Sequence, residues 1–184
     1  MKAAQLDAWT VFDVVAFYEE FQAIRPDPKH RNPACREARR RPPMPPLVID
    51  VRNAEDARDV IHRAVQALAE GRLVAFPTET VDGIGASACR PDAIERLRAL
   101  KDREQKSPFS LAIKSAEEAI DFVPDMSPLA RRFARRCWPG PVTLVVDSHH
   151  REGLASQLPD AVRALVAPNG TVGLRVPAND ILLD

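Results

Sequence analysis

Apolar and polar positions follow two rhythms along most of the chain, and each rhythm predicts a type of element. Apolar residues spaced three and four apart predict helices that begin near Asn53, Pro91 and Ser127. Short β-prone runs predict strands at residues 72–76, 109–113, 142–146 and 171–175. Because helices and strands interleave, we expect an α/β or α+β fold with a twisted mixed sheet and flanking helices.

The ends of the predicted helices carry residues that suit helix termini. Asn53 is a good N-cap for the first helix, and Gly71 stands where its C-terminal cap belongs. Ser115 and Glu118 have the spacing of a capping box. The sequence WPGP at residues 138–141 is expected to end the helix that precedes it.

The N-terminal part of the chain has a different composition, and we separate it as residues 1–46 from a domain at 47–184. Residues 8–24 hold five of the ten aromatic residues at spacings compatible with a helix. Residues 26–46 contain seven prolines and six cations against two acids, which is typical of a solvated linker. This stretch is a tether, a basic arm that touches RNA, or sequence upstream of a true start at Met44.

Composition narrows the class of protein. With 184 residues, of which 45% are hydrophobic and 28% charged, the chain can form the core of one domain. Lys and Arg equal Asp and Glu at 26 each, so no overall basic bias indicates nucleic-acid binding. Three separated cysteines argue against a disulfide framework, and no apolar run approaches the ~18 residues of a membrane span. We therefore expect a cytoplasmic protein.

The first candidate for chemistry is the P-T-E-T-x-x-G-x-G sequence at residues 77–85, which is expected to form a glycine-bearing loop. The hydroxyls of Thr78 and Thr80 would lie just past a strand end, where open α/β sheets commonly bind ligands. In the alternative interpretation the loop is a tight turn in which the threonines bond their own backbone.

Two cationic sets are further candidates. Lys101 and Arg103, with Lys106 nearby, suit a polyphosphate, because Arg grips an anion with two parallel hydrogen bonds and Lys supplies a point charge. The alternative is a solvated helix end favoured by the helix dipole. Arg175, at the end of an apolar strand, is expected to point toward the binding edge of the sheet or to serve as a solubilising residue on an edge strand.

Three other features are weaker candidates. Trp138 is expected to plug the core, and His149 with His150 lacks the third ligand that a metal site needs. A cationic helix face is most simply solvated, with RNA contact as the alternative, and comprises Arg131, Arg132, Arg135 and Arg136.

Four segments together resemble one known family. In chain order they are GRLVAFPTETVDGIGASA, LKDREQKSPFSLAI, CWPGPVTLVV and TVGLRVPAN. In them the chain resembles the YrdC-like domain of threonylcarbamoyl-AMP synthases, over roughly residues 53–184. The resemblance implies a sheet around a positively lined cavity, and a nucleotidyltransferase that joins L-threonine, bicarbonate and ATP and releases pyrophosphate. Its product, threonylcarbamoyl-AMP, would serve tRNA modification, with transferases of that process as partners.

The resemblance also implies roles for individual residues. Thr80 would contact threonine, and Arg175 would hold the threonine carboxylate. Lys101 and Arg103 would be the catalytic pair that meets the nucleotide and its phosphates. Positions near ATP would be those of Ser107 and Thr143, and Mg²⁺ would accompany the ATP.

Three departures from the family pattern leave an alternative open. Asp82 stands where the family usually has tyrosine, Ala112 where members often have histidine, and the chain ends before the family's S-x-N segment. We therefore expect a domain that is incomplete at its C-terminus relative to the family. The alternative is a YrdC-like module that binds double-stranded RNA or tRNA without synthase activity. A third interpretation is a carbamoyl-transfer subdomain of a larger hydrogenase-maturation protein.

Overall fold

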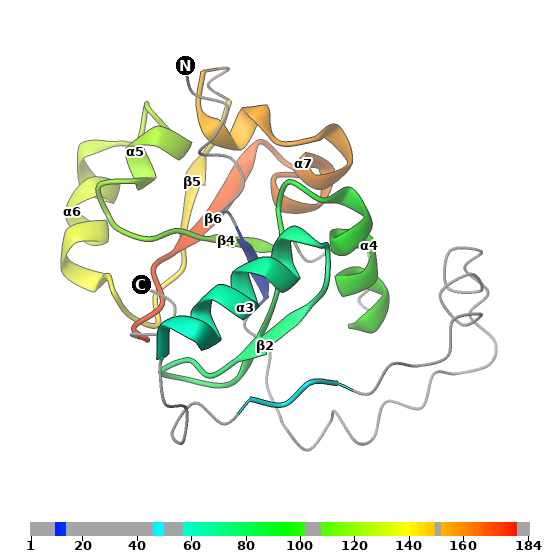
Figure 1. Ribbon diagram of the computed structural model, residues 1–184. Helices are drawn as coiled ribbons and strands as arrows, with labels where there is room; N and C mark the ends of the chain where they lie inside the picture. Colours follow the sequence, from blue (N-terminus) through cyan, green and yellow to red (C-terminus); the bar gives the residue numbers. More distant parts are fainter. Residues whose placement is uncertain (1–9, 14–45, 50–56, 102–107, 150–151, 180–184) are drawn as a thin grey trace.

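The computed structural model describes residues 10–13, 46–49, 57–101, 108–149 and 152–179, which form a mixed sheet with flanking helices (Figure 1). The helices are α3 (Ala57–Ala69), α4 (Pro91–Leu100), α5 (Ala119–Phe122), α6 (Pro128–Cys137), α7 (Asp160–Val166) and the 3₁₀ helix η3 (Leu154–Gln157). The strands are β1 (Thr10–Asp13), β2 (Val74–Phe76), β3 (Gly83–Ser87), β4 (Ser110–Ala112), β5 (Leu144–Asp147) and β6 (Thr171–Arg175). The expected α/β class with a mixed sheet is confirmed.

The six described strands lie in the order β2-β3-β1-β4-β6-β5. Strands β4 and β6 pair in parallel, with Leu111 opposite Leu174, while the other described pairs are antiparallel. In the view of Figure 1, α5 and α6 lie at the left and α4 and α7 at the right of the central strands. The C-terminal end of β6 and the β2–β3 hairpin lie at the same lower end of the sheet.

Alternation along β6 separates a core face of the sheet from a polar face. Val172 and Leu174 are fully buried and pack with Leu111 of β4 in the main core. Gly173 and Arg175 alternate with them and therefore belong to the other face. The helices contribute further fully buried core residues, among them Ile94, Leu97, Phe122, Val162 and Val166.

The prediction of a helix over residues 8–24 is wrong for Thr10–Asp13, which form strand β1 between β3 and β4. Thr, Val and Phe have high β propensity, and pairing with two neighbouring strands outweighs a helical spacing of aromatics. The sequence analysis assigned these four residues to the N-terminal segment, whereas the structure includes them in the sheet. Residues 14–24 and the proline-rich stretch up to residue 45 lie outside the described residues.

The loop expected over residues 77–85 is also partly wrong, because strand β3 begins at Gly83. Gly83 pairs with Phe76 of β2, and a Cβ added at Gly83 would approach the Phe76 ring to 2.8 Å. Glycine is therefore required here so that the aromatic ring can lie against the neighbouring backbone. From the sequence, Gly83 was expected to belong to a loop, but in the structure it makes room for the Phe76 ring within the β2–β3 hairpin.

The predicted helices at Pro91 and Ser127 are confirmed as α4 and α6, and the helix near Asn53 as α3, whose start lies outside the described residues. Ser127 caps α6 by accepting a hydrogen bond from the Ala130 N–H at 3.1 Å. Trp138 is buried as expected and donates its indole N–H to the Val142 carbonyl at 2.6 Å. The 3₁₀ helix η3 and helix α7 fill the stretch between β5 and β6.

Within the described residues, no helix combines the length and the apolar character that a membrane crossing requires. Among the described residues, Cys89 and Cys137 form no disulfide. The described side chains also contain no group of three or more His, Cys, Asp or Glu placed to hold a metal ion.

Candidate functional site

The centre of the candidate site is the guanidinium of Arg175, at the C-terminal end of β6. Its side chain is only 5% exposed and ranks among the few buried polar groups of the described chain. Its Nε donates to the Gly140 carbonyl at 3.2 Å, and its Nη2 lies 2.6 Å from Glu79 and 3.4 Å from the Thr80 hydroxyl. Arg175 therefore points toward the PTET loop and the turn at Gly140, and the solubilising role is excluded because the side chain is buried.

Three segments that are distant in the sequence meet at this guanidinium. The PTET loop supplies Glu79 and Thr80, the turn after α6 supplies Gly140, and β6 supplies Arg175 itself. The Gly140 N–H also donates to the Val176 carbonyl at 2.8 Å, which ties the turn to the residue after Arg175. Glu79 and Gly140 were not among the site residues expected from the sequence. A signal for Glu79 was present, because a buried arginine requires nearby acceptors and Glu79 is the acid of the PTET motif.

Glu79 makes contacts with both of its carboxylate oxygens. Oε1 accepts from Arg175, and Oε2 accepts from the Ala178 N–H at 3.1 Å. Burial raises the pKa of the Glu79 carboxyl, but the hydrogen bond and charge of Arg175, together with backbone N–H groups, outweigh burial and hold the pKa below its ordinary value. The carboxylate is therefore charged at neutral pH.

The threonines of the PTET loop divide between a structural and a site position. The Thr78 hydroxyl donates to the Val81 carbonyl at 2.6 Å and accepts from the Thr80 and Val81 N–H groups at 3.3 Å each. This is the self-satisfied turn considered as the alternative. The Thr80 hydroxyl instead lies 3.2 Å from the Thr78 hydroxyl and faces Arg175.

The polar face of β6 next to Arg175 is built from small residues. A Cβ added at Gly173 would lie 3.0 Å from the Ser110 hydroxyl and 3.2 Å from the Thr143 methyl. Gly173 is two positions before Arg175, so Thr143 and Ser110 flank the same face of the sheet. The structure thus brings together Thr80, Thr143 and Arg175 of the expected site residues.

The rest of the expected nucleotide site is described only in part. Lys101 ends helix α4, where its backbone N–H donates to the Leu97 carbonyl at 3.2 Å. Arg103 and Ser107 lie outside the described residues, so their roles stay predictions. Asp82 is exposed at the end of the PTET loop, and Ala112 lies in β4 opposite Arg175.

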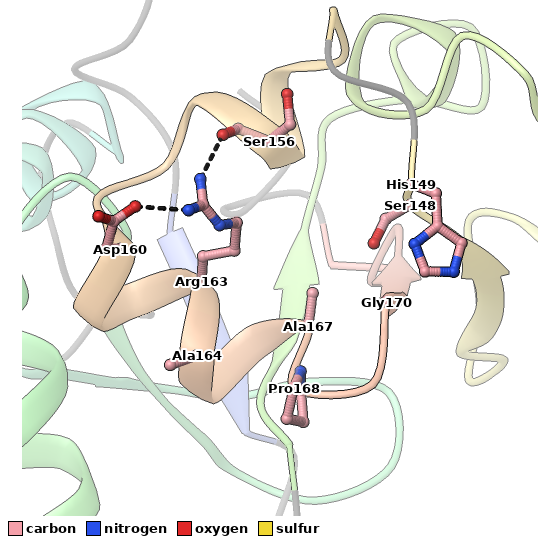
Figure 2. Close-up of a pocket in the computed structure, with 9 residues that line it drawn as sticks. All are labelled: Ser148, His149, Ser156, Asp160, Arg163, Ala164, Ala167, Pro168 and Gly170. Atoms are coloured by element: carbon pink, nitrogen blue, oxygen red, sulfur yellow. Dashed lines mark hydrogen bonds and ion pairs between the residues drawn. The ribbon is translucent and has the colours of Figure 1, made fainter.

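Neither of the two described pockets is lined by Arg175, Glu79, Thr80 or Lys101. Figure 2 shows the larger one, of about 640 Å³, at the opposite end of β6. There Arg163 points to the Asp160 carboxylate and the Ser156 carbonyl, while His149 lies beside Gly170. The smaller pocket, of about 360 Å³, includes Trp138 and Val176. The positively lined cavity implied by the resemblance therefore stays a prediction.

The cationic face of α6 includes one arginine with a structural role. Arg131 donates to the Met126 and Pro124 carbonyls at 2.9 and 3.0 Å, so it secures the segment before the helix. Arg132, Arg135 and Arg136 are exposed. These contacts reduce the set of arginines available to RNA from four to three.

The ion pair of Glu79 predicts a pH dependence of stability. A carboxyl whose pKa is lowered on folding stabilises the protein fully above its unfolded pKa of about 4.3, and this contribution is lost as the pH falls through the lower folded value. We therefore expect the difference in unfolding free energy between wild type and Glu79→Gln to stay constant from pH 7 to about pH 5 and to shrink below that. Urea unfolding at a series of pH values measures it, and a difference that grows on acidification would contradict the ion pair.

Comparisons with known proteins show which proteins this chain is similar to. Residues 66–184 match the Sua5/YciO/YrdC family model, described as telomere recombination. A threonylcarbamoyl-AMP synthase of Pyrococcus abyssi is 36% identical over 123 residues, which cover 67% of this chain and 34% of that protein. A threonylcarbamoyl-AMP synthase of Bacillus subtilis is 32% identical over 124 residues, 67% of this chain and 33% of that protein.

The chain is also similar to solved structures. The crystal structure of Pyrococcus abyssi Sua5 complexed with L-threonine superposes with a TM-score of 0.58 at 34% identity, and the match covers 70% of this chain and 35% of that one. The chain thus spans about a third of the length of these relatives. The family model covers more than half of the chain and includes the PTET loop, the turn at Gly140 and Arg175. The chain belongs to the Sua5/YciO/YrdC family.

Proposed function

We propose that this chain carries a threonylcarbamoyl-AMP synthase domain, which forms threonylcarbamoyl-AMP from L-threonine, bicarbonate and ATP and releases pyrophosphate. The observation that carries the proposal is the buried Arg175 beside Thr80, in a chain related to proteins of that name. A buried guanidinium next to a hydroxyl suits an amino acid that has a carboxylate and a side-chain hydroxyl. The product would serve tRNA modification, and described cysteines without a disulfide suit a reducing compartment such as the cytoplasm.

In this proposal the threonine half of the site is the Arg175 cluster. The guanidinium would hold the threonine carboxylate by a charge-assisted hydrogen bond, and the Thr80 hydroxyl would contact the substrate. Both groups are held in place by contacts within the protein before any ligand arrives. Such preorganisation reduces the cost of ordering side chains when the ligand binds.

The nucleotide half would be formed by Lys101, Arg103, Ser107 and Thr143. Thr143 flanks the same sheet face as Arg175, which would place the nucleotide next to the amino acid. Magnesium usually binds through one or two carboxylates and the phosphates of its substrate. Asp82 offers an exposed carboxylate for this purpose, whereas Glu79 is already bound to Arg175, so the donor set fits a metal held mainly by ATP.

The chemistry would depend on positioning and electrostatics. The threonine amine forms a C–N bond with the carbon of bicarbonate, and water leaves to give a carbamate. A carbamate oxygen then attacks the α-phosphate of ATP, the P–O bond to the β-phosphate breaks, and pyrophosphate leaves. This step brings several anions together, so fixed cations and hydroxyl donors would lower its barrier by stabilising the charge as it develops. The proposed mechanism requires no covalent nucleophile from the protein.

One variant tests the nucleotide half separately from the threonine half. We expect Lys101→Ala to weaken ATP binding by roughly tenfold or more and to leave threonine binding within about twofold, because it removes a cation from the nucleotide half alone. Calorimetric titration with Mg–ATP and with L-threonine measures the two affinities, and a pyrophosphate assay with bicarbonate measures turnover. Wild type that is folded but releases no threonine-dependent pyrophosphate would overturn the proposed function.

A further inference from the structure

Glu79 links the Arg175 side chain to the backbone that follows β6. One carboxylate oxygen lies 2.6 Å from Arg175 Nη2, and the other accepts the Ala178 N–H at 3.1 Å. The Glu79 side chain is 19% exposed, so its contact with Arg175 is partly shielded from water, whereas its contact with the Ala178 N–H is exposed. Because both oxygens are bound, the carboxylate cannot turn away from Arg175 without also releasing Ala178.

The donors of Arg175 show which part of the guanidinium can meet a ligand. An arginine has five N–H hydrogens in a rigid plane. Nε is used by Gly140, and the two hydrogens of Nη2 face Glu79 and Thr80. Among the described residues, no partner is seen for Nη1. The contacts of Nε with Gly140 and of Nη2 with Glu79 fix the guanidinium plane, and this plane sets the direction of Nη1.

We infer that Glu79 is a positioning residue for substrate recognition: it fixes the guanidinium plane so that Nη1 of Arg175 meets the carboxylate of the amino-acid substrate. This inference rests on the proposed function and deepens it. Glu79 occupies Nη2, so the substrate carboxylate binds at Nη1 and does not displace the internal ion pair. Glu79 acts through Arg175 and does not itself contact the reacting atoms.

The test compares Glu79→Gln with wild type by titration with L-threonine and with L-threoninol, which keeps the amine and hydroxyl but lacks the carboxylate. In Glu79→Gln the amide oxygen can still accept from Arg175, but the amide NH₂ then faces the Ala178 N–H, so the bridge is broken. We expect the Kd for L-threonine to rise roughly tenfold and the Kd for L-threoninol to change by less than about twofold. In turnover, KM for threonine rises while kcat changes little.

Control variants make the result specific. Glu95→Gln removes a partly exposed ion pair with Arg98 on α4, 2.8 Å long, and should leave both affinities unchanged. Glu79→Asp keeps the charge but is shorter by one methylene, and should restore part of the threonine affinity that Glu79→Gln loses.

Three outcomes would overturn the inference: unchanged threonine affinity in folded Glu79→Gln, equal losses for threonine and threoninol, or tighter threonine binding, which would show that Glu79 competes with the ligand. Failure of the proposed function is a separate result, namely no binding of either compound by wild type. In that case, hydrogen exchange at the Arg175 side-chain N–H signals decides the positioning role, because it should be slow in wild type and fast in Glu79→Gln.

Discussion

Arg175→Ala is expected to abolish threonine-dependent pyrophosphate release and to lower the free energy of unfolding by about 3 kcal/mol. The loss of stability follows because Glu79 would be left without its cation and the Gly140 carbonyl without its donor. Removing one member of a buried ion pair leaves the other desolvated and uncompensated, which costs more than the pair itself contributes. Urea unfolding measures the stability, and calorimetric titration measures threonine binding.

Arg175→Lys separates charge from geometry at this position. A single ammonium group cannot reach Glu79, Thr80 and Gly140 in the fixed plane of a guanidinium, so we expect partial stability and a large loss of threonine affinity. The matched control is Arg98→Ala, which breaks a partly exposed pair and should change stability by less than about 1 kcal/mol. An Arg175→Ala protein as stable as wild type would show that the ion pair is not formed.

A double variant checks that Glu79 and Arg175 act as a pair. If Arg175→Ala destabilises the protein mainly by leaving the Glu79 charge unpaired, then adding Glu79→Ala should recover part of the lost unfolding free energy. The loss in the double variant should then be smaller than the sum of the losses in the two single variants by about 1–3 kcal/mol. Additive effects would mean that the two side chains stabilise the fold independently.

The elements that could be predicted from the sequence are those whose conformation depends on signals within the element itself. Helices α4 and α6 were predicted because their caps and apolar spacing are local signals, as the Ser127 cap shows. Strand β1 was not predicted, because its conformation depends on two partner strands more than 70 residues further along the chain. Gly83 indicated a loop, although its role becomes clear only beside the Phe76 ring.

The candidate site divides in the same way. Arg175 and Thr80 could be chosen from the sequence because each lies at a strand end within a recognisable motif. Glu79 could not be assigned a partner, because the contact joins residues 96 positions apart. Gly140 acts through its backbone carbonyl, and backbone acceptors have no residue-type signal in a sequence. The sequence thus predicts which side chains carry charge to the site but not what orients them.

Gly140→Ala is the second variant for which we expect a large effect, although the residue contributes no side chain. A Cβ at this position would lie 2.5 Å from the Cys137 carbonyl oxygen, so the backbone of the turn must move. The same residue accepts from Arg175 and donates to Val176, and both hydrogen bonds would move with it. We expect an unfolding free energy lower by about 1–3 kcal/mol, together with weaker threonine binding because the guanidinium loses one of its two fixed sides.

Gly170→Ala provides the comparison that separates stability from recognition. Gly170 has φ +72°, where alanine costs about 1–2 kcal/mol, and its added Cβ would also contact His149 at the opposite end of β6 from Arg175. Both variants should therefore unfold at lower urea, but only Gly140→Ala should bind threonine less tightly. Equal threonine affinities in the two variants would show that the turn at Gly140 does not orient Arg175, and that the Glu79 contact alone fixes the guanidinium plane.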